Sequence, residues 1–528
     1  MRTSSPFARA ARAALTTFAL LICLASAGAQ QRTVYENPVI AGDFPDPSII
    51  RTGQDYWATT TSGTWEPEFP ILHSRDMVNW EVVGAVFQKR PDWAARDFWA
   101  PEISEDHGRF FVYYTARKKN GPLCVAVASA AKPDGPYTDH GPLVCQEIGS
   151  IDPMAVMDEN HERYLVWKED GNSRNQPTPI WAQKLNEAGT KLIGSKKELI
   201  RNDPKSWEGG VVEGAFILRH NDWFYLFYSG NACCGRSCNY AMGVARSRKL
   251  LGPWEKNPDN PILAENQAWQ CPGHGSIVAD ESGRNFLLYH AYKKSEVAFY
   301  IGREAVLDEV TWDSSGWPSI NHGKGPSKQA PSPRAITKSR AENSFFDDFN
   351  SQTLKPSWQW PQENKPLIRL ETSGGGRLIL TSTSDQANDP TGAVISQPMT
   401  EADYTATALV NASEMKDGEL AGLSAYSGRE DALGVASAPG KILIYKREGK
   451  RQQIIKTLTV PAAPLLYLRM AVTNGSRYRF AFSTDGRVWK EAGEEVDGSF
   501  LEGAHIALTA GGIKGASARF DWIRITTP

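Results

Sequence analysis

The chain has 528 residues, more than one ordinary domain holds, so two or three domains are expected. A formal net charge of -2 argues against nucleic acid or an anionic membrane surface as the main partner. The hydrophobic content of 41% is enough for globular cores, and 17 tryptophans suit either an all-β core or a protein that handles sugars.

Residues 1–29 have the pattern of a secretory signal peptide. Arg2, Arg9 and Arg12 give a positive start, residues 13–24 are apolar but too few to span a bilayer, and residues 27–29 form a small-x-small cleavage site. We therefore expect a secreted or periplasmic protein that has no membrane contact after the signal is cleaved.

The cysteines beyond this segment are even in number, which permits disulfides in an exported protein. They are Cys124, Cys145, Cys233, Cys234, Cys238 and Cys271. Their spacing leaves the pairing open. The cluster CCGRSC (233–238) lacks the paired CxxC spacing or nearby histidines of a zinc site, so disulfides that tie a long loop are favoured over metal binding.

Five segments between residues 46 and 292 resemble one another. They are 46–62, 100–116, 152–170, 213–230 and 273–292. Each has a polar or Pro/Gly-containing start, an apolar strand, a turn, and a second strand of aromatic and β-branched residues, which is the pattern of a β-hairpin. Further strand-like runs fill the gaps, so each unit offers about four strands at a period of roughly 40–60 residues. The pattern predicts a five-bladed β-propeller.

The first residues of the innermost strands should point into one mouth of the propeller. Those starts are Asp46, Glu102, Asp152, Glu213 and His274. A single acid at a strand start is more often a cap than a catalyst, but three or four at equivalent points of a symmetric scaffold are harder to dismiss. Several carboxylates without a nucleotide-binding or GxSxG motif favour glycoside hydrolysis, which needs one protonated acid and one ionised carboxylate.

These motifs carry a family resemblance. The segments NPVIAGDFPDPSII (37–50), FWAPEI (98–103), SIDPMAV (150–156), VVEGAFI (211–217), CPGHGS (271–276) and GREAVLDEVTWDSSGWP (302–318) together resemble glycoside hydrolase family 43. The resemblance implies a five-bladed propeller over residues 30–320 and an enzyme that inverts anomeric configuration. It further implies action on arabinofuranosyl or xylosyl linkages of plant-type polysaccharides or oligosaccharides.

The resemblance also implies roles for single residues. Asp46 matches the general base, Glu213 the general acid, and Asp152 the carboxylate that raises the pKa of the acid and orients it. His274 matches a histidine near the propeller centre that in some relatives helps hold a water or a metal ion, and Arg303 matches a substrate-contacting arginine. No cofactor is required, and a structural calcium ion near the centre is kept as an alternative. Glu102 is expected to be structural.

Four aromatic residues are candidates for sugar platforms, with core packing as the competing use. They are Trp65, Phe98, Trp99 and Trp167. The stretch TSGTWEPEFPILHS (61–74) resembles the pocket-building segment of exo-acting members, so an exo-acting arabinofuranosidase or xylosidase is favoured over an endo-arabinanase. A propeller lectin that binds glycans without cleaving them is the alternative from another class.

The C-terminal part has a different pattern. Residues 321–343 are rich in Pro, Ser, Lys and Gly and are expected to form a linker. Residues 344–528 hold closely spaced runs of alternating apolar residues, which predict a β-sandwich. FFDDF, STDGRVW and FDWIRI resemble the concanavalin A-like domain of some family 43 β-xylosidases. Packing against the propeller is favoured there over an independent sugar-binding role.

Overall fold

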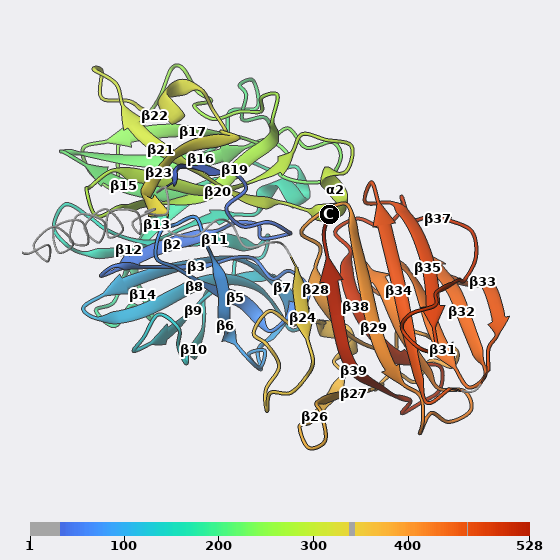
Figure 1. Cartoon of the computed structure of the whole chain (residues 1–528). Coiled ribbons are helices and arrows are strands. Elements are labelled where there is room, and N and C mark those ends of the chain that lie inside the picture. Colours follow the sequence, from blue (N-terminus) through green and yellow to red (C-terminus); the bar gives the residue numbers. More distant parts are fainter. Residues whose placement is uncertain (1–31, 337–343, 462) are drawn as a thin grey trace, which may run out of the picture.

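The computed structural model describes residues 32–336, 344–461 and 463–528. The expected signal peptide, 1–29, lies outside these residues. The fold is almost wholly β, with a propeller-like unit beside a sandwich-like unit (Figure 1). No helix in the part of the chain that the structure describes is both long and apolar enough to cross a bilayer.

The first unit contains five antiparallel sheets of four strands each. From the inner to the outer strand, the first blade holds β2 (Ser48–Thr52), β3 (Asp55–Thr59), β5 (Glu68–Ser74) and β6 (Glu81–Phe87), and the second holds β7 (Ala94–Asp106), β8 (Arg109–Lys118), β9 (Leu123–Ala130) and β10 (Thr138–Val144). The third blade holds β11 (Ser150–Met157), β12 (Arg163–Glu169), β13 (Ile180–Leu185) and β14 (Leu192–Ile200), and the fourth holds β15 (Val212–His220), β16 (Trp223–Gly230), β17 (Ala241–Ser247) and β18 (Glu255–Lys256). The fifth blade holds β19 (Trp269–Ala279), β20 (Asn285–Lys293), β21 (Glu304–Trp312) and β22 (Pro318–Ile320).

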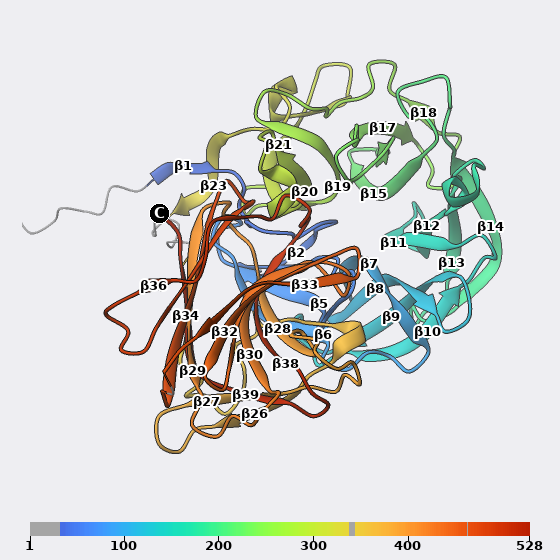
Figure 2. The same cartoon turned by 90° about the vertical axis from the view of Figure 1, so that its right-hand side faces the viewer.

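The inner strands of these sheets surround a common centre, as Figure 2 shows. They contact one another in the order β2, β7, β11, β15 and β19, and β19 contacts β2 in turn. Each inner strand forms an antiparallel hairpin with the strand that follows it. The prediction of five hairpin-based blades is therefore confirmed.

Neighbouring blades pack through alternating faces of their second strands. On β16, Phe224 and Leu226 pack into the apolar core shared with the third blade, while Tyr225 and Phe227 pack into the core shared with the fifth. Because side chains alternate across a strand, a strand that is apolar at every position can fill both cores. This packing explains the continuous aromatic runs in the sequence repeat.

The segment predicted as a linker, 321–343, is partly regular structure. Strand β23 (Gln329–Ile336) pairs with β1 (Arg32–Glu36), and residues 337–343 lie outside the described residues. The short helices are η2 (Gly171–Arg174), α2 (Ala298–Ile301), η3 (Asn321–Gly323) and η4 (Gln362–Asn364).

The second unit is a sandwich of two antiparallel sheets, as predicted. One holds β24 (Phe345–Asp347), β26 (Leu367–Glu371), β27 (Arg377–Thr381), β29 (Tyr404–Asn411), β34 (Leu465–Thr473), β35 (Arg477–Ser483), β36 (Lys490–Glu491), β37 (Val496–Asp497) and β39 (Ser517–Thr526). The other holds β28 (Ala393–Pro398), β30 (Leu420–Tyr426), β31 (Ala432–Ala438), β32 (Lys441–Glu448), β33 (Arg451–Thr459) and β38 (His505–Gly511).

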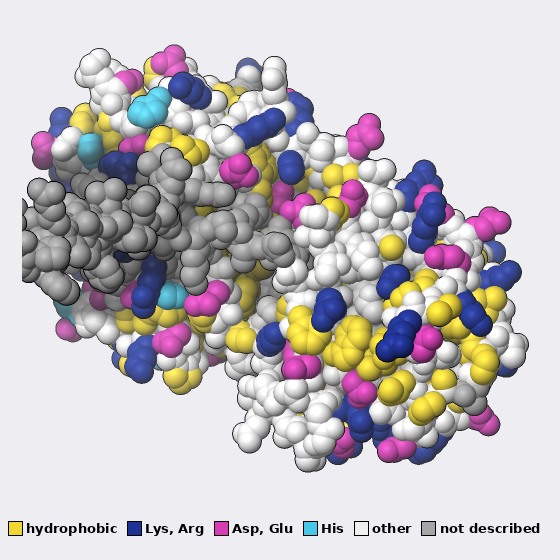
Figure 3. Space-filling view, viewed as in Figure 1, with side chains coloured by type: hydrophobic (Ala, Val, Ile, Leu, Met, Phe, Trp, Pro, Cys, Tyr) yellow, Lys and Arg dark blue, Asp and Glu magenta, His cyan; other side chains and the backbone are white. Residues whose placement is uncertain are grey.

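The two units are joined by side-chain and strand contacts. Strand β4 (Trp65–Glu66) of the first blade pairs with β25 (Trp360–Pro361), and the Trp65 ring stacks on His505 with centroids 3.7 Å apart. Gln362 donates to both carboxylate oxygens of the buried Glu68. On the face drawn in Figure 3, positive and negative side chains are interspersed, as the near-neutral net charge suggests.

Candidate active site

Each blade has a residue in the left-handed backbone region within its inner strand or just before it, at equivalent positions. These residues are Asp46 (φ 53°), Ala100 (φ 43°), Asp152 (φ 55°), Gly214 (φ 59°) and His274 (φ 43°). In β7, β11, β15 and β19 the pairing register with the second strand shifts close to this point, as in a β-bulge, which re-aims side chains. The sequence alignment of blade starts is thereby corrected in two blades, because Ala100 and Gly214, not Glu102 and Glu213, occupy the equivalent position.

Each of these five residues is braced by a side chain from the preceding blade. The bonds run from Ala100 N–H to Thr61 Oγ1 (2.7 Å), Asp152 N–H to Thr115 Oγ1 (3.1 Å), Gly214 N–H to Asp152 Oδ2 (2.9 Å), His274 N–H to Ser229 Oγ (2.8 Å) and Asp46 N–H to His290 Nδ1 (3.1 Å). The braces hold this backbone in place; for the four residues other than Gly214 the left-handed conformation costs of order 1–3 kcal/mol each, and such strain clusters at functional sites.

Asp46 sits among cationic and hydrogen-bonding groups. Its Oδ1 lies 3.4 Å from Arg303 Nη1 and 3.4 Å from His274 Nδ1, and its Oδ2 accepts a hydrogen bond from Thr61 Oγ1 at 2.6 Å. Burial opposes the charge, but Arg303, His274 and His290 hold the pKa of Asp46 well below its ordinary value. Asp46 is therefore an ionised carboxylate at neutral pH, as a base must be.

Glu213 and Asp152 form a second acidic pair. Glu213 Oε2 accepts a hydrogen bond from Lys168 Nζ at 2.7 Å, and Oε1 accepts one from Tyr240 Oη at 2.9 Å. Burial opposes the charge on Glu213, but Lys168 and then His274 lower its pKa. Burial, with the Glu213 charge, raises the pKa of Asp152 to about 6. Asp152 and Glu213 thus interact as one acidic pair, and the raised pKa of the acid Glu213 stays a prediction from the family resemblance.

Gly214, which follows Glu213 in the segment VVEGAFI, occupies a position where only a glycine fits without strain. Gly214 adopts φ +59°, and a Cβ at this position would lie 2.8 Å from His274 Cγ. Its N–H is the donor to Asp152. A residue without a Cβ therefore lets the Glu213 strand approach both His274 and Asp152.

Arg303 and Asp43 form a support beside Asp46. The Arg303 backbone N–H donates to Asp43 Oδ1 at 2.8 Å, which fixes the start of the segment that carries the guanidinium. Arg303 and His274 keep 18% and 17% of their side-chain surface exposed, against 10% for Asp46, so the cluster is reached from solvent. Asp43 is thus tied to Arg303, the predicted substrate-contacting residue.

Two of the predicted aromatic platforms are wrong. The side chains of Phe98 and Trp167 have no exposed surface, because both lie in cores between blades, and Trp167 Nε1 donates to Gln146. Trp99 and Trp65 stay predictions, although one ring face of Trp65 is covered by His505. Glu102, which was expected to be structural, forms a side-chain hydrogen bond with Ser48, and burial raises its pKa to about 8.

Sequence reasoning missed three residues of the site: Lys168, Tyr240 and His290. Lys168 interrupts the apolar strand RYLVWKE, and a lysine in such a strand is a usable signal because lysine is rarely buried without a partner. Tyr240 and His290 stack with centroids 5.7 Å apart and planes 4° apart, linking the surroundings of Glu213 and Asp46. Nothing in their local sequence indicates this contact.

Disulfides shape one rim of the site. The described cysteines form the pairs Cys124–Cys145, Cys233–Cys234 and Cys238–Cys271. The last ties the loop 231–239, which precedes Tyr240, to the strand that carries His274. The loop also reaches the sandwich, since Arg236 Nε lies 2.7 Å from Glu502 Oε1.

The calcium ion considered near His274 stays a prediction from the family resemblance. Calcium takes six to eight oxygen ligands. The nearby carboxylates of Asp46, Asp152 and Glu213 are already engaged by protein donors. Among residues 32–336, 344–461 and 463–528, no group of three or more His, Cys, Asp or Glu side chains is arranged to hold a metal ion.

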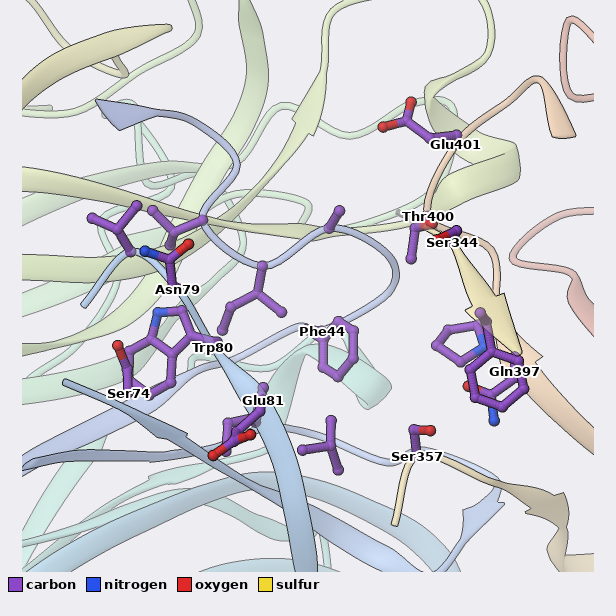
Figure 4. A pocket seen from close by; sticks show the side chains of 18 of the residues that line it. Phe44, Ser74, Asn79, Trp80, Glu81, Ser344, Ser357, Gln397, Thr400 and Glu401 are labelled. Atoms are coloured by element: carbon purple, nitrogen blue, oxygen red, sulfur yellow. The ribbon is translucent and has the colours of Figure 1, made fainter. Parts of the chain in front are cut away.

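A separate cavity lies between the first blade and the sandwich (Figure 4). Its volume is about 890 Å³, and Phe44, Trp80 and Gln397 are among its lining side chains. Of the described residues that line it, none is a member of the acidic cluster. The acidic cluster at the propeller centre and this interdomain cavity are therefore separate sites.

Comparison with known proteins agrees with this architecture. The sequence model "Glycosyl hydrolases family 43" matches residues 35–318, and "Beta xylosidase C-terminal Concanavalin A-like domain" matches residues 346–526. Xylosidase/arabinosidase 43B of Humicola insolens is 27% identical, with 92% of this chain and 96% of that protein covered. Non-reducing end alpha-L-arabinofuranosidase BoGH43B of Bacteroides ovatus is 25% identical, with 94% and 96% covered.

A solved structure extends the match to three dimensions. GH43 protein BlXynB of Bacillus licheniformis superposes with a TM-score of 0.81 at 26% identity, covering 94% of this chain and 100% of that chain. The first family model alone spans more than half of the 528 residues. The chain therefore belongs to glycosyl hydrolases family 43 and is a glycoside hydrolase that acts on a carbohydrate.

Proposed function

We propose that the protein is an inverting exo-glycosidase that releases single arabinofuranosyl or xylosyl units. The observation that carries the proposal is the division of the acidic cluster into two environments. Asp46 is held ionised by Arg303 and His274, while Asp152 and Glu213 form a second pair that retains a proton near pH 6. Two carboxyl environments that differ in this way are what acid–base cleavage of a glycosidic bond requires.

In the proposed mechanism Asp46 takes a proton from a water, and that water attacks the anomeric carbon. Glu213 gives a proton to the departing glycosidic oxygen on the opposite face, so the products are one sugar of inverted configuration and one alcohol. The two carboxyl groups must be roughly 6.5–9.5 Å apart to leave room for the water. Arg303 and His274 would contact the sugar beside Asp46.

Asp152 would serve the acid in two ways. Its Oδ2 accepts the Gly214 N–H, which fixes the backbone next to Glu213. Its own proton lies near Glu213, so the pair titrates as a unit and not as two independent groups. The transferable proton is then a property of the Asp152–Glu213 pair.

Substrate, location and domain division rest on the relatives and on sequence. The similar proteins are named as xylosidases or arabinosidases, and one of them, from Cellvibrio japonicus, as an extracellular exo-alpha-(1->5)-L-arabinofuranosidase. Secretion after cleavage of residues 1–29, a catalytic propeller at 30–320 and an accessory sandwich at 344–528 are the corresponding proposals for this chain. The sandwich would support the first blade through the β4–β25 pairing.

The test is the hydrolysis of nitrophenyl α-L-arabinofuranoside and nitrophenyl β-D-xyloside by the native enzyme and by Asp46→Ala and Glu213→Ala. Each substitution should reduce kcat/KM by about 10²-fold or more. Circular dichroism should show that both variants stay folded. Substantial activity in either folded variant would contradict the assignment.

A further inference from the structure

Lys168 occupies a position that the propeller repeats. In four blades, the residue just before the left-handed position pairs with one residue of the second strand. The pairs are Trp99 with Thr115, Ile151 with Lys168, Glu213 with Ser229 and Gly273 with His290. In the first blade Thr61 N–H bonds to Pro45 O in the same way. Lys168 is therefore the third-blade equivalent of Thr61, Thr115, Ser229 and His290.

The side chains equivalent to Lys168 each accept a hydrogen bond from a backbone N–H of the next blade. A lysine side chain cannot accept such a bond. A lysine ammonium has three donors and no acceptor. At this one junction the acceptor is supplied by Asp152, which takes the Gly214 N–H at 2.9 Å. Bracing of the backbone, the structural role of this position elsewhere in the ring, therefore does not account for Lys168.

The ammonium of Lys168 is buried between two carboxylates. Its side chain is 1% exposed, and Nζ lies 2.7 Å from Glu213 Oε2 and 3.1 Å from Asp170 Oδ1. A buried charge is costly unless it is paired, so both acids contribute to keeping Lys168 in place. Asp170 is itself fixed, because its N–H donates to Gly149 O.

We propose that Lys168 is a positioning residue for the acid of this enzyme, which holds the Glu213 carboxyl in place and, with Asp170 as its constant partner, sets how readily Glu213 carries the proton that the leaving oxygen receives. The inference rests on the proposed role of Glu213. When Glu213 is protonated, Asp170 still neutralises the ammonium, so no unpaired charge stays in the interior. Tyr240 donates to the other oxygen of Glu213, and His274 and Asp152 also interact with its charge.

Two substitutions are expected to move the pH profile in opposite directions. Lys168→Met removes the cation beside Glu213, so its proton is lost at higher pH and the basic limb of kcat/KM should move up by about one pH unit or more. Asp170→Asn leaves Lys168 to Glu213 alone, so the basic limb should move down. Lys168→Gln keeps a donor without a charge and should behave like Lys168→Met.

The matched control is Lys184→Met, which removes a partly exposed lysine of the adjacent strand β13 whose partner is Glu162. Its pH profile should equal that of the native enzyme. Should Lys168→Met fail to fold, as judged by circular dichroism, Asp170→Asn carries the test, because Asp170 is 13% exposed and keeps its backbone contacts. Basic limbs that stay within about 0.2 unit in every folded variant would overturn the inference.

Leaving-group dependence separates this inference from the proposed function. Glu213→Ala should lose much less activity on a 2,4-dinitrophenyl glycoside than on a 4-nitrophenyl glycoside, because the better leaving group needs no proton. Equal losses on both would contradict Glu213 as the acid and with it the proposed function. Unequal losses together with unmoved basic limbs in Lys168→Met and Asp170→Asn would leave the function standing and remove the role of Lys168.

Discussion

Replacing Gly214 by alanine would push a methyl group against His274. The new Cβ would lie 2.8 Å from Cγ, 3.1 Å from Nδ1 and 3.2 Å from Cβ of that histidine, with the backbone at φ +59°. The left-handed conformation alone costs an alanine about 1–2 kcal/mol. The melting temperature of the propeller should therefore fall by roughly 2–8 °C before the contact with His274 is counted.

Activity should fall further than stability, because the ring that is displaced lies 3.4 Å from Asp46 and the N–H that shifts is the donor to Asp152. A displacement of about 1 Å at a reacting geometry can reduce a rate by about 10²-fold. Differential scanning calorimetry and kcat/KM on a nitrophenyl glycoside measure the two effects.

Two other glycines separate the causes. Gly53 adopts φ +64°, and a Cβ at this position would have nothing within 4 Å. The Gly53→Ala variant should therefore be less stable because of backbone strain and should keep its activity. Gly210→Ala has open space and no left-handed backbone, so it should change neither. The reasoning is refuted if Gly214→Ala melts no lower than Gly53→Ala and retains kcat/KM within about two-fold of the native enzyme.

Three more substitutions test the surroundings of the site. Tyr240→Phe removes the donor to Glu213 Oε1, so the basic limb of kcat/KM should move to higher pH, and an unchanged pH profile would speak against this hydrogen bond. Asp152→Asn concerns a carboxyl whose pKa is about 6 when folded and near 3.9 when unfolded, so native stability falls as pH rises through this window. Urea unfolding should show that the free energy of unfolding of the variant rises relative to that of the native protein between about pH 4 and pH 6. A difference between the two free energies that does not change with pH would contradict the raised pKa of Asp152. Cys238→Ser opens a crosslink across 33 residues and should cost roughly 3–4 kcal/mol of stability, which equal denaturation midpoints would disprove.

The repeat in the sequence was enough to predict the propeller and the meeting of Asp46, Asp152, Glu213 and His274. Hairpin signals are local, and five similar starts must converge if the blades close. The sequence did not indicate which residues of the second and fourth blades are equivalent to Asp46, because a bulge places the left-handed position at Ala100 and Gly214.

Other parts of the site depend on tertiary register. Lys168 reaches Glu213 from β12 and Tyr240 from the end of the loop before β17, and no spacing in the sequence indicates that they meet on its two oxygens. Phe98 and Trp167 were misassigned because both rings lie in the apolar cores between blades, and the local sequence does not indicate which side of a strand faces such a core. Aromatic content alone does not distinguish a sugar platform from a core.

The configuration of the first sugar released tests the central claim most directly. Proton NMR recorded within the first turnovers of a β-D-xyloside or an α-L-arabinofuranoside distinguishes the anomers before they equilibrate. If Asp46 activates a water while Glu213 protonates the leaving oxygen, the opposite anomer appears first. Initial appearance of the same anomer would mean that a covalent intermediate forms, and it would contradict the roles proposed for both residues.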